Sequence, residues 1–290
     1  MALVAFAVTN QIMNSFLFQP LVEAALREDL RSGDLTTEAL IPADARGTAL
    51  LNFRVAGIVC GMPLAEMAFK TLDPDAVIET LIPDGGHAKT GATVMRVQAN
   101  ARALLSAERV ALNFAQRLSG IATLTAQYVA LAAGTPARIA DTRKTTPGLR
   151  IAEKYAVRTG GGTNHRYALD DMILIKDNHI ALCGGIGKAV EKARKRVGHT
   201  VKIEVECDNL KQVEEALAAH ADIILLDNMS LQQLRDAAGL IDGAAVAEAS
   251  GGVNLETVAE IAKTGVDIIS VGALTHGVRS LDIGLDIEVF

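Results

Sequence analysis

The sequence predicts an α/β protein whose C-terminal half forms a parallel α/β barrel, closed or nearly closed. After Pro136, six short apolar runs alternate with helical patterns, the arrangement expected of βαβ units and a parallel sheet. No Gly-x-Gly-x-x-Gly lies between a strand and a helix, which disfavours an open doubly wound sheet. Half of the 290 residues are hydrophobic but only 3% are aromatic. The core must therefore be mainly Ala, Val, Ile and Leu, as in packed helices and buried parallel strands.

The part before residue 135 has a mixed pattern, and we interpret residues 1–134 as a separate domain with a linking helix. A helix is predicted at 19–30 because Leu21, Val22, Ala25 and Leu26 form one apolar face. Pro63 opens a second helix that runs to residue 71. Strand-like runs occupy 48–55, 58–60, 76–81 and 93–99, and a long helix occupies 103–132.

The barrel domain is assigned to residues 135–274, and 275–290 are expected to return to the N-terminal domain. Its strands are predicted at 137–142, 172–176, 201–207, 222–227, 244–250 and 267–272. Helical patterns between them lie at 187–197, 210–219, 231–241 and 255–263. Consecutive strands joined by helices are parallel neighbours, so their carboxyl ends are expected at one mouth.

Composition excludes several classes of protein. The formal net charge of −6 disfavours a nucleic-acid binder, which needs a broad basic surface. The three cysteines show no CxxC spacing, which favours a reducing compartment, and we expect a cytoplasmic protein. Residues 1–18 are apolar but contain no Lys or Arg, so a tail or docking helix is favoured over a signal peptide. No run is long and apolar enough to predict a membrane span.

Positive charge is concentrated between Arg143 and Arg166. This segment has one acid, Glu153, and six basic residues: Arg143, Lys144, Arg150, Lys154, Arg158 and Arg166. Guanidinium groups grip carboxylates bidentately, and glycines such as Gly160 let backbone N–H groups approach an anion. The segment therefore predicts a pocket for a small, highly charged anion, with a solvated charged loop as the alternative.

Each predicted barrel strand ends in polar residues. These ends are Asp141–Lys144, Lys176–His179, Glu204 with Glu206, Asp227–Asn228, Glu248–Gly252 and Ser270–Gly272. Ligands of α/β barrels bind at the carboxyl ends of the strands, so the six ends predict one site. Small residues follow the last two strands, which is typical of a phosphate site built from backbone N–H groups. For single residues a helix cap remains the alternative, as for Asn178 and Asn228.

Two further patterns leave alternatives open. Glu206 and Asp227 beside a phosphate ligand suggest a divalent cation or sugar hydroxyls, with a structural Glu–Lys pair as the alternative for Glu206. On the long helix, Arg109, Asn113 and Gln116 lie on one face that Gly120 extends. That polar face is directed either at solvent or at a pocket.

Nine runs resemble one known family, quinolinate phosphoribosyltransferase, across residues 21–286. They are EDLRSGDLTT at 28–37, ERVALN at 108–113, SGIAT at 119–123, DTRKTTPGLR at 141–150, NHR at 164–166, LIKDNH at 174–179, LDN at 226–228, EASGG at 248–252 and VGALTH at 271–276. The DTRKTTPGLR and NHR runs are the most specific. The surroundings of Gly277 and Arg279 are less typical of the family, and residues 1–18 have no counterpart in it.

The resemblance implies an N-terminal α/β sandwich and an incomplete parallel α/β barrel of the type II phosphoribosyltransferase kind. It implies a homodimer with shared active sites, a higher hexamer being the alternative, whereas the composition already predicts no nucleic-acid or membrane partner. The reaction would join quinolinate to 5-phosphoribosyl-1-pyrophosphate (PRPP) with Mg²⁺, giving nicotinate mononucleotide, pyrophosphate and CO₂. The runners-up are a relative acting on nicotinate, the relative associated with molybdenum transport, and a non-catalytic nucleotide sensor.

The resemblance also implies roles for single residues. Arg143, His165 and Arg166 would hold the quinolinate carboxylates near Thr142, and Arg109 would reach in from the partner subunit. Lys144, Lys176, Glu206 and Asp227 would be catalytic, the two lysines meeting the pyrophosphate and the two acids facing the ribose and, directly or indirectly, Mg²⁺. The 5-phosphate would bind backbone N–H groups of Ser250, Gly251, Gly252, Val271, Gly272 and Ala273.

Overall fold

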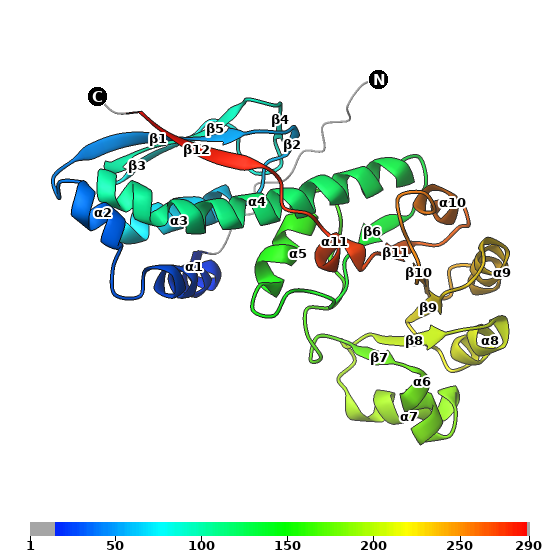
Figure 1. Ribbon diagram of the computed structural model, residues 1–290. Helices are drawn as coiled ribbons and strands as arrows, with labels where there is room; N and C mark the ends of the chain where they lie inside the picture. The colour runs from blue at the N-terminus through cyan, green and yellow to red at the C-terminus, as the bar shows by residue number, and fades with distance from the viewer. Residues whose placement is uncertain (1–14, 289–290) are drawn as a thin grey trace. The chain divides into compact units, whose positions relative to one another are not determined.

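The computed structural model describes residues 15–288, which divide into two compact units (Figure 1). The first unit comprises residues 15–126, 146–161 and 277–288, and the second comprises 127–145 and 162–276. Most of the predicted N-terminal tail or docking helix lies outside the described residues. Helix α1 (Ser15–Leu30) begins four residues before the predicted start, and Pro20 lies inside it.

The first unit contains an antiparallel sheet in the order β12-β1-β5-β3. Its strands are β1 (Arg46–Phe53), β3 (Val77–Thr80), β5 (Thr93–Asn100) and β12 (Ile283–Glu288). A separate short pair joins β2 (Gly57–Ile58) to β4 (His87–Ala88). Strand β12, red in Figure 1, pairs with β1 so that Leu285 lies opposite Leu51. No strand was predicted there, although this segment was expected to return to the first domain.

Helices α2 (Leu35–Leu40), α3 (Met62–Leu72), α5 (Arg150–Thr159) and most of α4 (Ala101–Ala132) belong to the same unit. Helices α2 and α5 were not predicted. The start of α2 is set by Asp34, whose carboxylate accepts a hydrogen bond from Thr37 N at 3.0 Å.

Helix α5 is held by a buried ion pair. Glu153 has no exposed side-chain surface and accepts hydrogen bonds from Arg117 Nη2 at 2.7 Å and Arg117 Nε at 3.1 Å. Its other oxygen accepts from the backbone N–H of Thr146 at 3.1 Å. A Cβ on Gly160, at the end of α5, would collide with the Ala122 carbonyl of α4, so the two helices touch backbone to backbone. This packing groups 146–161 with the first unit.

The second unit contains a parallel sheet in the order β6-β11-β10-β9-β8-β7. Its strands are β6 (Arg138–Ala140), β7 (Ile173–Ile175), β8 (Ile203–Cys207), β9 (Ile223–Asp227), β10 (Val246–Ser250) and β11 (Ile268–Ser270). Successive strands are neighbours, β6 closes onto β11, and the ring is open between β6 and β7. This order confirms the incomplete barrel. The closed barrel and the doubly wound sheet were wrong.

The helices of this unit follow the strands as predicted, with two additions. Helices α7 (Ile186–Arg196), α8 (Leu210–Ala218), α9 (Leu231–Ile241) and α10 (Val258–Ala262) occupy the expected places. The additions are α6 (Asp177–Cys183) and α11 (Ala273–His276). The polar run after β7 is therefore the first turn of α6, for which Lys176 is the N-cap. No helix within residues 15–288 is both long and apolar enough to cross a membrane.

Candidate functional site

A cavity of about 590 Å³ opens at the carboxyl ends of the strands of the second unit. It is lined by Thr142, Arg143, Lys144, His165, Arg166, Leu174, Lys176, Glu206, Leu225, Asp227, Asn228, Glu248, Ser250, Gly251, Gly252 and Ser270. These residues come from the ends of all six strands and from the segment after β6. The strand ends that were expected to share one site therefore open onto one cavity, because parallel strands present their carboxyl ends at one edge.

Only three of the six basic residues between Arg143 and Arg166 line this cavity. Arg143, Lys144 and Arg166 line the cavity. The other three basic residues, Arg150, Lys154 and Arg158, lie on α5 in the first unit, so the prediction of one pocket for the whole segment was wrong in this respect. Helical periodicity explains the difference, since the middle of the segment folds as an amphipathic helix.

The guanidinium groups of Arg143 and Arg166 are placed to bind an anion in the cavity. Arg143 Nε is buried and has no hydrogen-bond partner within residues 15–288, and a buried donor of this kind is costly unless a ligand satisfies it. Arg166 donates from Nη1 to the Met172 carbonyl at 3.0 Å. Burial, with the charge of Arg143, lowers the pKa of Arg166. An acid with two carboxylates would relieve the repulsion between these cations.

Lysine and acid side chains meet in the same cavity, at the ends of β7 and β8. Lys176 Nζ lies 2.5 Å from Glu206 Oε2, so the Glu–Lys pair that we considered for Glu206 exists. The Lys176 side chain is 46% exposed and both residues line the cavity, which leaves the pair open to a ligand. Asp227, one strand along, accepts a hydrogen bond from the Asn228 side chain at 2.7 Å.

The glycines after β10 are required by their backbone conformation. Gly251 has φ +90° and Gly252 has φ +62°, a region that residues with a Cβ rarely adopt. A Cβ on Gly251 would collide with the Asn228 side chain and lie 2.8 Å from its backbone nitrogen. Asn228 does not cap α9. That cap is Ser230, whose hydroxyl accepts from Gln233 N.

The remaining predicted phosphate residues lie next to the cavity. Val271 is buried, and Gly272 is so close to Lys144 that an added Cβ would lie 3.0 Å from its Cδ. Ala273 begins α11. The Thr275 hydroxyl donates to the Lys144 carbonyl at 2.8 Å, which fixes the backbone of the lysine beside this turn. Their role in binding phosphate stays a prediction.

His165, for which a substrate role was predicted, forms a largely buried group with two strand-end acids, and this grouping was not predicted. His165 contacts Glu204 and Glu248, with its Nε2 atom 3.1 Å and 3.5 Å from their oxygens. Burial, followed by the charge of Glu204, raises the pKa of Glu248 to about 7. The placement of Glu204 and Glu206 two residues apart on one strand was the sequence signal for this group, but the partner of Glu204 was not foreseeable.

The polar face of the long helix is divided. Arg109 and Asn113 are exposed in the first unit, whereas Gln116 donates to the Ile283 carbonyl at 2.7 Å. An added Cβ on Gly120 would collide with the Arg279 carbonyl. Half of this face is therefore structural, because it packs against the chain returning to β12. The contact of Arg109 with a ligand stays a prediction.

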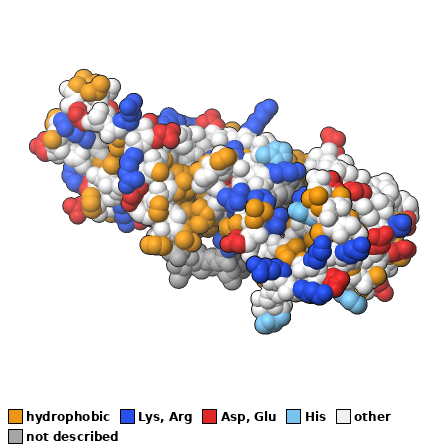
Figure 2. Space-filling view, turned by 90° about the horizontal axis from the view of Figure 1, so that it is seen from below, with side chains coloured by type: hydrophobic (Ala, Val, Ile, Leu, Met, Phe, Trp, Pro, Cys, Tyr) orange, Lys and Arg blue, Asp and Glu red, His pale blue; other side chains and the backbone are white. Residues whose placement is uncertain are grey.

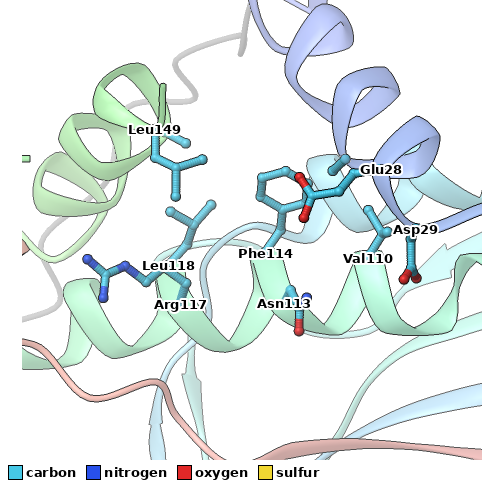
Figure 3. Close-up of a pocket in the computed structure, with 10 residues that line it drawn as sticks. Glu28, Asp29, Val110, Asn113, Phe114, Arg117, Leu118 and Leu149 are labelled. Atoms are coloured by element: carbon cyan, nitrogen blue, oxygen red, sulfur yellow. The ribbon is translucent and has the colours of Figure 1, made fainter. Parts of the chain in front are cut away.

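A smaller cavity of about 200 Å³ lies in the first unit (Figure 3). Its labelled side chains come from α1, α4 and the start of α5, and include the acids Glu28 and Asp29. The lining residue Arg117 is already bound to Glu153. This cavity does not offer the unsatisfied cations that an anion requires.

The surface carries mixed charge. On the face shown in Figure 2, Lys and Arg side chains are interspersed with Asp and Glu side chains. This face therefore lacks the continuous basic surface that phosphate backbones bind, in keeping with the net charge of −6.

Comparison with known proteins covers nearly the whole chain. Residues 34–119 match the family described as "Quinolinate phosphoribosyl transferase, N-terminal domain", and residues 121–286 match the corresponding C-terminal domain. The chain is 44% identical to the probable nicotinate-nucleotide pyrophosphorylase [carboxylating] of Bacillus subtilis, with 96% of each chain covered. It is 43% identical to the mitochondrial quinolinate phosphoribosyltransferase [decarboxylating] 2 of Nicotiana glauca, covering 92% of this chain and 81% of that protein.

Solved structures agree with this assignment. The nicotinate-nucleotide pyrophosphorylase of Francisella tularensis superposes with a TM-score of 0.91 at 40% identity, covering 95% of this chain and 98% of that one. The protein of the same name from Ehrlichia chaffeensis gives 0.89 at 44% identity, covering 93% and 98%. Since both family domains match in order and the relatives align over almost their full length, the chain belongs to the quinolinate phosphoribosyltransferase family.

Proposed function

We propose that this protein transfers the phosphoribosyl group of PRPP to quinolinate with loss of CO₂, yielding nicotinate mononucleotide and pyrophosphate. The observation that carries the proposal is the convergence of Arg143, Arg166 and Lys176 with two carboxylates in one cavity. Two guanidinium groups match two carboxylates, which favours quinolinate over the monoacid nicotinate. A sensor would have little use for the lysine–acid arrangement beside them.

We propose a separate role for the residues near each of the two substrates. Arg143 and Arg166 would bind the quinolinate carboxylates at the end where the Arg143 Nε atom is unsatisfied. Lys144 and Lys176 would neutralise the negative charge of the leaving pyrophosphate. Glu206 and Asp227 would accept hydrogen bonds from the ribose hydroxyls and stabilise the positive charge that develops at the ribose carbon. The N–H groups of residues 250–252 and 271–273 would hold the 5-phosphate.

The acidic pair is chemically suited to Mg²⁺. Glu206 and Asp227 supply carboxylate oxygens on adjacent strands, and Mg²⁺ in phosphate sites is commonly bound by one or two carboxylates together with substrate oxygens. When bound, the ion would offset negative charge on the pyrophosphate. Glu206 would then bind the ion and weaken its ion pair with Lys176. The lysine would become available to the pyrophosphate.

The second half of the reaction needs no dedicated base. Once the ring nitrogen carries the ribose it is cationic, and it withdraws electrons from the neighbouring carboxylate. The electron pair of the breaking C–C bond stays on the ring carbon and is protonated from solvent as CO₂ leaves. Arg143 and Arg166 would hold the carboxylates in place during this step.

We further propose a homodimer in which Arg109 of one subunit completes the site of its partner. The Arg109 side chain is 57% exposed on α4, so it is available to a second chain. A hexamer built from such dimers is the alternative. The three cysteines form no disulfide, in keeping with a reducing compartment such as the cytoplasm.

One assay tests the proposed function. The protein is incubated with PRPP, Mg²⁺ and quinolinate labelled in the carboxyl groups, and CO₂ and pyrophosphate are measured together. We expect both products in equal amounts, and neither when nicotinate replaces quinolinate. Pyrophosphate release with nicotinate alone would identify the relative of altered substrate. Binding of PRPP without any product would identify a sensor.

The phosphate site can be tested at two adjacent glycines. Gly251→Ala and Gly252→Ala both place a Cβ at a positive φ, +90° and +62°, but only the first collides with Asn228. Since such overpacking costs about 1–3 kcal/mol, we expect the KM for PRPP to rise roughly 5- to 150-fold in Gly251→Ala. Gly252→Ala serves as the matched control with a smaller rise. A KM for PRPP equal to that of the wild type in both variants would remove this turn from the PRPP site.

A further inference from the structure

Both ring nitrogens of His165 are directed at the protein, although the residue lines the cavity. The Nδ1 atom accepts a hydrogen bond from the backbone N–H of Arg166 at 2.8 Å. The Nε2 atom lies 3.1 Å from Glu204 Oε2 and 3.5 Å from Glu248 Oε1. The side chain is only 10% exposed. This geometry differs from that of a histidine that presents an N–H group to a substrate carboxylate.

The hydrogen-bond network assigns the tautomer. The backbone N–H of Arg166 donates to Nδ1, so Nδ1 must carry a lone pair. The proton of the neutral ring is therefore on Nε2. That proton points between two buried carboxylates. Glu204 has no exposed surface and neither of its oxygens has a hydrogen-bond partner within residues 15–288, whereas Glu248 accepts a hydrogen bond from the Ser270 hydroxyl. Since Nε2 lies only 3.1 Å from Glu204 Oε2, the His165 proton is close enough to satisfy this carboxylate.

A metal ion is a poor alternative for this cluster. The ligand atoms of His165, Glu204 and Glu248 lie within 4.8 Å of one another, a spacing that would suit an ion. However, a metal-binding histidine coordinates through a lone pair and donates its other ring N–H to the protein. Here the assignment is reversed, because the nitrogen that faces the carboxylates carries the proton and the other nitrogen accepts.

We propose that His165 is a positioning residue: a neutral imidazole, anchored by Glu204 and Glu248, that fixes the backbone of Arg166 and thereby the place of its guanidinium. The proposal rests on the proposed function, since it concerns the group that would bind quinolinate. It assigns Glu204 and Glu248 to the floor of the quinolinate site, although neither would touch the substrate.

The surroundings of Arg166 support this role. The segment before it is fixed by Asp141, which is fully buried and accepts hydrogen bonds from His165 N at 3.0 Å and the Asn164 side chain at 2.5 Å. The guanidinium of Arg166 is held at one point by the Met172 carbonyl. The amide of Arg166 is the link between these two fixed points, and His165 is its hydrogen-bond acceptor. Loss of that acceptor would let the guanidinium drift.

The tautomer can be observed directly. Protein with ¹⁵N-labelled histidine is studied by NMR between pH 6 and 8, and the His165 signals are assigned by their loss in His165→Asn. We expect a neutral Nε2–H imidazole in the free protein and no change of protonation when quinolinate binds. A ring that becomes doubly protonated with quinolinate, or one that carries its proton on Nδ1, would overturn the proposal. The free protein is measured without substrate, so this result is independent of catalytic activity.

Two variants separate positioning from direct binding. Asparagine places an acceptor oxygen near the position of Nδ1, so His165→Asn should retain most of the affinity for quinolinate. His165→Ala should weaken quinolinate binding roughly 10- to 100-fold, because small displacements of an orienting group are costly. The KM for PRPP should change little in both, and the exposed His199→Ala controls for loss of any histidine. Equal losses in the Asn and Ala variants would contradict a positioning role, whereas an inactive wild-type protein would instead refute the proposed function.

Discussion

Replacement of Arg143 by alanine should reduce the affinity for quinolinate by roughly 30- to 4,000-fold, because a buried carboxylate that loses its charged partner costs about 2–5 kcal/mol. The loss should be large since Arg143 Nε is buried in the cavity without a protein partner, so the side chain has no other evident role. Isothermal titration of quinolinate into wild type and variant measures the effect.

The same strand supplies the control. Arg138 begins β6, whereas Arg143 follows its end, so Arg138→Ala removes an exposed arginine from the opposite end of the sheet. Its affinity for quinolinate should equal that of the wild type. If Arg143→Ala bound quinolinate as tightly as Arg138→Ala, then Arg143 would not belong to the substrate site.

The second large effect concerns stability. Arg117→Leu should lower the free energy of unfolding by about 3–5 kcal/mol, because it leaves the Glu153 carboxylate buried without its partner. Arg117 is itself only 24% exposed, so little of this interaction is screened by water. Urea unfolding of the variant and the wild type at neutral pH measures the loss.

A double variant isolates the cause. Arg117→Leu combined with Glu153→Leu removes both charges, and apolar replacement of a buried ion pair is often tolerated. It should recover part of the lost stability, although the N–H group of Thr146 then lacks its acceptor. If the double variant were less stable than Arg117→Leu alone, the unpaired charge would not be the origin of the loss.

Elements with strong periodicity could be predicted from the sequence. The helix at 231–241 was predicted with the observed bounds, and the strands of the parallel sheet were located to within a few residues. Strand β12 was missed because its pattern is weak and its stability comes from pairing with β1, more than 200 residues away. Helix α5 was missed because its charged residues resembled a loop, and a buried Arg117 partner for Glu153 cannot be read locally.

The residues of the candidate site likewise fall into those that the sequence could place and those that it could not. Arg143, Arg166, Lys176, Glu206 and Asp227 could be placed together because each follows or ends a strand, and parallel strands share one edge. The partners of His165 could not be placed. Strand periodicity assigns Glu204 to a face of β8, but which side chain meets it depends on where the loop of residues 162–166 turns.

The sequence by itself determined the alternation of strands and helices, the edge at which the polar residues gather, and the family to which the chain belongs. These follow from local periodicity and from motifs that are read one residue at a time. Only the tertiary structure decided which basic residues reach the cavity, where the ring opens, and which side chain lies beside Glu204. Such outcomes depend on distances of a few ångströms between segments far apart in the chain, and burial makes each of them energetically decisive.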